Sequence, residues 1–340
     1  MNAHPSSPDR GASRLAHFPI TLYGSVMGLC GLAIAYLRAT AILDWPSVIG
    51  QVILYVTAVW FVILTLLYVA KLSRYPHRVA EEFNHDVKVN FFPAISISLL
   101  LLAVGFVHLQ PGLAAVLWWI GTPLHLIYTM RILHEWITRD LHVHSFNPAW
   151  FIPPVGNILV PVAGVDIANQ ELSWFFFSGG LFYWVALFAI VLYRVFFHDP
   201  LPKKLIPTLA IMLAPPAVGF IALYKLTGSF GDFHRVLYMM ALFTFLLLLT
   251  MVNRFRKTPF FVSWWAYTFP LAAISIATML YYHLTGLLVM RFASMAMLAF
   301  ATVVVVVVLI RTIRAVFAGE ICVPEGEPKP AAKAAAEAGI

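Results

Sequence analysis

The sequence predicts an all-α integral membrane protein with ten transmembrane helices, and three observations lead to this fold class. Hydrophobic residues make up 61% of the 340 residues and charged residues 11%, whereas soluble globular proteins carry roughly 25% charged residues. The apolar residues gather in runs of about 20, the length that a helix needs to cross a ~30 Å hydrocarbon core. The basic residues lie between these runs, so the net charge of +7 is typical of membrane topology signals and does not indicate nucleic-acid binding.

The apolar segments follow one another along the chain with short connections. They occupy residues 17–38, 47–71, 91–109, 112–134, 150–168, 172–197, 205–226, 233–253, 261–283 and 288–313. Residues 17–314 are therefore expected to form one ten-helix transmembrane domain. Residues 1–16 are polar and lack the apolar core of a secretory signal, so they predict a short cytoplasmic N-terminal segment. Residues 315–340 end in a stretch rich in Pro, Ala, Lys and Glu, which predicts a disordered cytoplasmic tail.

The lysines and arginines give the expected orientation. If all ten segments cross, every one of the 22 basic residues lies on the side of the two termini except Arg38, Lys225, Arg235 and Arg291. Cytoplasmic loops carry the excess of Lys and Arg in multi-pass proteins. The sequence therefore predicts that both termini are cytoplasmic, in a bacterial inner membrane.

Prolines recur in or at the start of the odd-numbered segments, at intervals of 55 to 74 residues. Proline kinks a helix, and the carbonyl that it frees must be satisfied by protein or by water. Prolines are also common in membrane helices generally. Their recurrence on alternate segments nevertheless favours five helical hairpins in a quasi-fivefold arrangement, with the kinked odd helices around a central pore. The residues that mark the kinks are Pro19, Pro93, Pro154, Pro215, Pro216 and Pro270.

The odd-numbered segments also carry small and polar side chains that are candidates for the pore wall. These are Gly24, Ser96, Asn157, Thr208 and Thr268. Small residues equally allow helices to pack closely. No Lys, Arg, Asp or Glu lies near the centre of an odd segment, although coupled carriers usually keep an ionisable residue at that depth. An uncharged wall suits weak binding and fast passage of small ions.

Phe269 is the candidate gate residue. It immediately precedes Pro270 in the ninth segment, and an apolar constriction can close a narrow pore by dewetting. Packing in the protein core explains an aromatic residue at this position equally well.

Other motifs do not indicate an enzyme, a metal site or a cofactor. His134 and Glu135 begin like a zinc-protease motif, but the second histidine that the motif needs is replaced by Thr138. Cys30 and Cys322 lie far apart and provide neither a disulfide framework nor a thiolate cluster. No nucleophile elbow or phosphate-binding loop is present.

Five motifs in order resemble the family of tellurite-resistance protein A, C4-dicarboxylate transporters and slow-type anion channels. They are FPI at 18–20, FFP at 91–93, NPAWFIPPVG at 147–156, APPAVG at 214–219 and WWAYTFP at 264–270. The resemblance implies a ten-helix channel domain with one pore in each protomer of a homotrimer. It also implies that Phe269 blocks the pore and rests beside a small residue of the first helix, by position Gly24.

Three functions remain open at this point. The first is a channel for small monovalent anions such as chloride or nitrate, gated by Phe269. The second is a secondary transporter of C4-dicarboxylates or tellurite, with His125 in the fourth segment as a proton-coupling residue; the same histidine could simply join packed helices. No buried pair of arginines that would chelate a dicarboxylate is evident. The third is an intramembrane enzyme with its site spread over distant helices.

Overall fold

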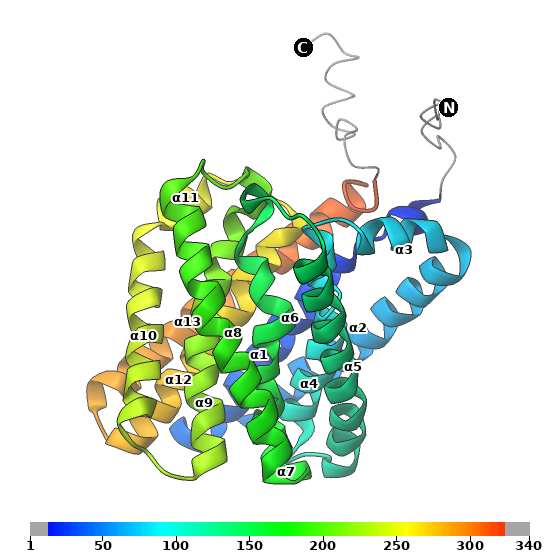
Figure 1. Cartoon of the computed structure of the whole chain (residues 1–340). Helices are drawn as coiled ribbons and strands as arrows, with labels where there is room; N and C mark the ends of the chain where they lie inside the picture. The colour runs from blue at the N-terminus through cyan, green and yellow to red at the C-terminus, as the bar shows by residue number, and fades with distance from the viewer. Residues whose placement is uncertain (1–12, 324–340) are drawn as a thin grey trace, which may run out of the picture.

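The computed structural model describes residues 13–323, which form helices and no strands (Figure 1). The expectations for residues 1–12 and 324–340 lie outside this range. The α-helices are α1 (Tyr23–Leu43), α2 (Ser47–Arg74), α3 (Pro76–Phe83), α4 (Ala94–Phe106), α5 (Pro111–Thr138), α6 (Ile152–Val155), α7 (Val160–Ile167), α8 (Gln170–Phe197), α9 (Ala214–Thr227), α10 (Asp232–Thr250), α11 (Val252–Arg256), α12 (Thr268–Thr285) and α13 (Leu288–Phe317). The 3₁₀ segments are η1 (Arg14–His17), η2 (Ile20–Leu22), η3 (Lys88–Phe91), η4 (Val143–Ser145), η5 (Pro148–Phe151), η6 (Gly156–Leu159), η7 (Lys203–Leu213) and η8 (Val262–Tyr267).

Nine helical segments of the described chain are long and apolar enough to cross a membrane. The tenth predicted span corresponds to η8 with α12. It is less apolar because the last turns of α12 carry Tyr281, Tyr282 and His283. The predicted order of the apolar segments is therefore confirmed, and the main difference in length is that α1 continues to Leu43, beyond the expected end at residue 38. The helix α13 likewise continues to Phe317.

Burial divides the segments into an inner and an outer set. In the most apolar stretch of the inner segments Ile20–Leu43, Lys88–Phe106, Pro148–Ile167 and Lys203–Thr227, between 56% and 94% of residues are buried. In the outer segments formed by α2, α5, α8, α10 and α13 the share is only 28% to 39%. The exposed residues of the outer helices are largely Val, Leu, Ile and Phe. A continuous apolar surface of this kind fits a hydrocarbon solvent.

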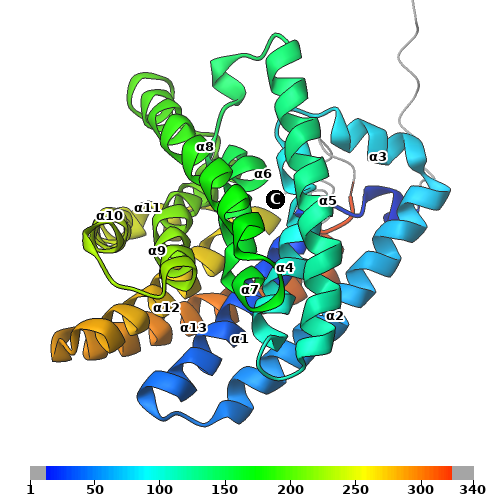
Figure 2. The ribbon, with the colours of Figure 1, turned by 60° about the horizontal axis from the view of Figure 1, so that its bottom comes forward.

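The helix α12, in which most residues are buried, belongs to the inner set, and the inner segments contact one another in a closed ring. Helix α1 packs against α4 and α12, α4 packs against α7, and α9 packs against both α7 and α12. Each inner segment also packs against the outer helix that follows it in the chain, as α1 does with α2, α4 with α5 and α12 with α13. Viewed toward the lower end, α2, α5, α8 and α10 lie at the periphery (Figure 2).

Each inner segment begins with 3₁₀ turns and continues as an α-helix. Prolines lie at or next to this change: Pro93 is the N-cap of α4, Pro215 and Pro216 lie in the first turn of α9, and Pro270 is the third residue of α12. A first-turn residue needs no backbone donor, because its N–H has no partner within the helix. Pro19 precedes η2, and Pro154 lies in the four-residue helix α6 between η5 and η6.

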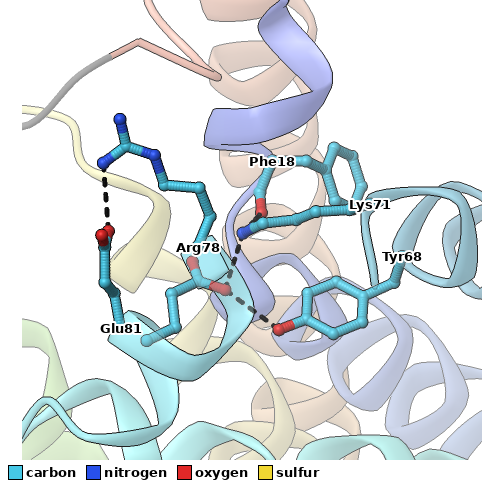
Figure 3. Close-up of polar contacts among 6 residues, drawn as sticks. Phe18, Tyr68, Lys71, Arg78 and Glu81 are labelled. Atoms are coloured by element: carbon cyan, nitrogen blue, oxygen red, sulfur yellow. Dashed lines mark hydrogen bonds and ion pairs between the residues drawn. The ribbon is translucent and has the colours of Figure 1, made fainter. Parts of the chain in front are cut away.

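A buried ion pair fixes the chain where it enters α1. The Lys71 Nζ atom at the end of α2 donates to Glu82 Oε2 on α3 at 2.7 Å and to the backbone carbonyl of Phe18 at 2.8 Å. The Tyr68 hydroxyl donates to the same carboxylate oxygen at 2.9 Å, and Figure 3 shows Lys71, Tyr68 and Phe18 converging. The Lys71 side chain is 1% exposed. These contacts connect α2, α3 and the segment before η2.

The described chain begins and ends at the same end of the bundle, beside α3, and α7 lies at the other end (Figure 1). We call these the terminal end and the opposite end.

Candidate functional site

Two cavities lie inside the ring of inner segments. The larger has a volume of about 90 Å³ and is almost entirely apolar; its polar wall residues include Thr21 of η2 and Ser263 of η8. The smaller has a volume of about 30 Å³, and Arg38 near the end of α1 is the charged residue in its wall.

The two cavities follow one line along the bundle. On α1 the larger cavity is lined by Thr21, Gly24 and Met27, and the smaller by Gly31, Ile34 and Arg38. Residues three or four apart lie on one face of a helix, so both cavities run along the same face of α1. The other inner segments repeat this order from the larger to the smaller cavity, with Ile97 then Leu101, Ile158 then Val162, Pro215 then Ile221, and Ala266 then Ile276.

Three side chains line both cavities and so form the constriction between them. They are Leu159 at the end of η6, Val218 in α9 and Phe269 in α12. All three are apolar, and Phe269 is the largest. Water leaves a narrow apolar constriction readily, which closes it to ions.

Glycines of α1 allow α12 to approach closely. A Cβ atom at Gly24 would lie 3.2 Å from Trp265 Cβ, one at Gly28 would overlap the Thr268 side chain, and one at Gly31 would lie 3.1 Å from Phe269 Cδ2. The glycine that faces the ring of Phe269 is therefore Gly31, whereas Gly24 lies beside Trp265 and lines the larger cavity. The spacing of the three glycines places them on one face of α1. The sequence alone does not show which of them faces the Phe269 ring.

Of the residues expected around the pore, Gly24, Phe269, Pro215 and Pro270 line the larger cavity. The polar candidates are placed differently. Each is buried and donates to the backbone carbonyl three residues earlier: Ser96 to Pro93 at 2.8 Å, Asn157 to Pro154 at 2.8 Å, Thr208 to Leu205 at 2.6 Å and Thr268 to Trp265 at 2.6 Å.

None of these four polar residues is among the wall residues of the two described cavities, nor are Pro19, Pro93, Pro154 and Pro216. The polar side chains satisfy carbonyls near the changes from 3₁₀ to α geometry, where the regular hydrogen bonds are interrupted. These residues lie where the backbone is irregular, and their side chains form hydrogen bonds with the backbone there.

His125 is fully buried where α5 meets α4 and η6. Its Nδ1 atom lies 2.9 Å from Ser96 Oγ. Its Nε2 atom has no hydrogen-bond partner in the described part of the chain, and a Cβ atom on Gly156 would lie 2.7 Å from it. His125 therefore packs between helices and lies outside the walls of both cavities.

Glu135 forms ion pairs with Arg131 and Arg139, each at 2.5 Å, near the end of α5. Arg139 also donates to Asn84 Oδ1 at 3.1 Å. The acidic residue of the apparent zinc-protease motif is thus held by arginines at the terminal end of the bundle.

A helical bundle with an apolar outer surface and a line of cavities between its inner helices is the architecture of a multi-pass α-helical membrane protein. Residues 17–313 match the SLAC1 family, described as voltage-dependent anion channels. The chain belongs to this family, and the resemblance seen in the five motifs is confirmed.

Individual relatives come from plants, archaea and bacteria. The chain is 32% identical over 311 residues to the S-type anion channel SLAH2 of Arabidopsis thaliana, which covers 89% of this chain and 60% of that protein. It is 26% identical over 334 residues to the uncharacterized transporter MJ0762 of Methanocaldococcus jannaschii. This match covers 91% of this chain and 98% of that protein. It is 24% identical over 268 residues to the tellurite resistance protein TehA homolog of Haemophilus influenzae. This match covers 78% of this chain and 81% of that protein. The chain thus spans about three fifths of the plant channel's length.

Proposed function

We propose that this chain is an anion channel that passes small monovalent anions, such as chloride and nitrate, through a pore in each protomer gated by Phe269. The observation that supports the proposal is that Phe269 lines both cavities and is the largest side chain that does so. The test is the anion current through wild type and Phe269→Ala in planar bilayers. A large anion-selective current in the variant supports the channel. If the folded variant carries no current, Phe269 is not the gate.

The wall of the proposed pore favours anions over cations by what it contains. No carboxylate is among the wall residues of the two described cavities, and Arg38 is the charged residue there. At the terminal end, Ser263 donates to the backbone carbonyl of Lys204 at 2.6 Å, so a basic segment lies beside the mouth of the larger cavity. A path with few strong binding groups permits fast passage. The anion channels among the relatives support the same substrate class.

The proposed assembly is a homotrimer in a bacterial inner membrane with both termini cytoplasmic. Within each protomer, five hairpins surround the pore in a quasi-fivefold arrangement. The ring of inner-segment contacts supports the hairpin arrangement, and the excess of basic residues on the side of the termini supports the orientation. The trimer rests on the family resemblance. Chemical cross-linking of the protein in membranes tests it.

The second candidate is a proton-coupled transporter of C4-dicarboxylates or tellurite. The observation that favours it is the unpaired Nε2 atom of the buried His125, because coupled carriers keep an ionisable group at membrane depth. A carrier of this kind predicts saturable uptake that depends on the pH gradient and is lost on substitution of His125. The channel predicts uptake that follows the electrochemical gradient of the anion alone.

A further inference from the structure

The smaller cavity has one charged side chain in an otherwise apolar wall. Arg38 lies inside α1 because the helix continues to Leu43, and it faces a cavity whose other wall residues include Ile34, Val104 and Ile276. Placing a guanidinium beside apolar groups costs free energy unless a partner of opposite charge is supplied. Its position therefore calls for an explanation.

The chain supplies Arg38 with no direct partner. Within residues 13–323 its guanidinium makes no hydrogen bond or ion pair, and the carboxylate that acts on it electrostatically is that of Asp166. The Asp166 carboxylate is already bound to Lys225 Nζ at 2.7 Å. Two cations and one carboxylate therefore lie near this mouth, and the donors of Arg38 remain available to a ligand.

Two basic side chains, Arg38 and Lys225, act electrostatically on the surroundings of this mouth. His108, in the connection between α4 and α5, has its pKa lowered by burial first and then by the charges of Arg38 and Lys225. The Asp166 carboxylate acts on the pKa of His108 in the opposite direction. The positive charge beside the smaller cavity comes from the arginine and the lysine. Focused fields of one sign raise the local concentration of counter-ions at a cleft.

Arg38 is also close to the proposed gate. It follows Gly31, the glycine that faces the Phe269 ring, by two turns of α1, which at 1.5 Å per residue is roughly 10 Å. Arg38 and Phe269 line the same cavity. An ion beside Arg38 is thus one short step from the constriction.

We propose that Arg38 forms a weak binding site for small monovalent anions at the opposite-end mouth of the pore, where it captures them before they pass Phe269. The site rests on the proposed channel function and adds a residue that sets anion entry and preference. The planar fork of the guanidinium donates two parallel hydrogen bonds to an oxyanion. Nitrate therefore binds there more tightly than chloride.

The experiment uses Arg38→Gln, Arg38→Lys and the control Arg291→Gln, each in the Phe269→Ala background. Arg291 lies in the first turn of α13 at the same end of the bundle, is exposed and lines neither cavity. It therefore reports the loss of one distant charge. Currents of anions that enter from the opposite-end side are recorded in low and high salt with chloride and nitrate.

Arg38→Gln lowers these currents about two- to tenfold in low salt, and high salt removes the difference by screening. Arg38→Lys keeps most of the chloride current and loses the nitrate preference, because a lysine has no planar fork. Arg291→Gln behaves like the background protein. Equal currents for Arg38→Gln and Arg291→Gln in low salt overturn the proposal.

A second measurement separates this inference from the channel itself. Crystals of the wild type and of Arg38→Gln are soaked in iodide, and anomalous density is sought beside residue 38. Density in the wild type that is absent in the variant supports the site even if Phe269→Ala carries no current, in which case only the channel fails. Absence of density in the wild type overturns the site.

Discussion

Gly31 of α1 and Phe269 of α12 face each other across the proposed gate: a Cβ atom on Gly31 would lie 3.1 Å from Phe269 Cδ2. The same Cβ atom would lie 3.1 Å from Ala272 Cβ, so the space beside the ring is filled on two sides. The position of the ring depends on the missing side chain of Gly31. A substituent there has to push the ring away from α1, toward the other residues that line both cavities, Leu159 and Val218.

Gly31→Val is therefore expected to narrow the constriction and to lower the residual anion current of the wild type severalfold. The reason is the steric displacement of the ring, since a contact at this distance must yield by a few tenths of an ångström or more. Anion efflux from liposomes measures the effect. In a Phe269→Ala background the same substitution has little consequence, because the displaced ring is gone.

Gly179→Ala provides the control for Gly31, since a Cβ atom at Gly179 has no neighbour within 4 Å. It is expected to leave the anion current unchanged. If Gly31→Val lowers the current equally in the presence and absence of the Phe269 ring, then Gly31 acts through helix packing and the proposed contact is not the cause.

Glu82→Gln is expected to destabilise the protein strongly. The substitution leaves Lys71, whose side chain is 1% exposed, without its anionic partner, and breaking a buried ion pair costs about 3–5 kcal/mol. Thermal unfolding in detergent, followed by the loss of the monodisperse peak on size exclusion, measures the change. The expected result is a midpoint several degrees below that of the wild type.

Glu81→Gln is the matched control on the same helix. Its ion pair with Arg78 at 3.0 Å is largely exposed, and such pairs contribute about 0–1 kcal/mol. Equal midpoints for the two variants would show that the Lys71–Glu82 pair does not secure the entry into α1.

His125→Asn is expected to leave the anion current and its independence of the pH gradient intact. His125 lies outside both cavities and is held by Ser96 at 2.9 Å, so its loss affects packing and costs about 1–3 kcal/mol of stability. Flux measured with and without an imposed pH gradient checks this. Loss of pH-coupled uptake in a folded variant favours the carrier instead.

The order of the spans and the identity of Phe269 as a wall residue could be predicted from the sequence because both depend on local patterns. Runs of about 20 apolar residues define spans directly, and the TFP turn marks where an inner helix changes geometry. The inner and outer sets also follow from the recurrence of proline on alternate segments.

The rotation of each helix about its axis could not be predicted in the same way. Ser96, Thr208 and Thr268 satisfy nearby carbonyls, and nothing in their spacing distinguishes that role from a place in the wall. The choice between Gly24 and Gly31 depends on the register of α12 against α1. A charged residue normally ends an apolar run, so the sequence predicts that the first span ends at Arg38, whereas α1 continues to Leu43 and Arg38 lines the smaller cavity.

The current through Phe269→Ala, recorded in planar bilayers under chloride and nitrate gradients beside the wild type, tests the central claim most directly. In the proposed channel the Phe269 ring closes the path between the two cavities, so its removal is expected to give an anion-selective, non-saturating current severalfold or more above that of the wild type. The reversal potential should follow the anion gradient. An unchanged current in a variant that is folded and inserted would contradict the assignment of Phe269 as the gate.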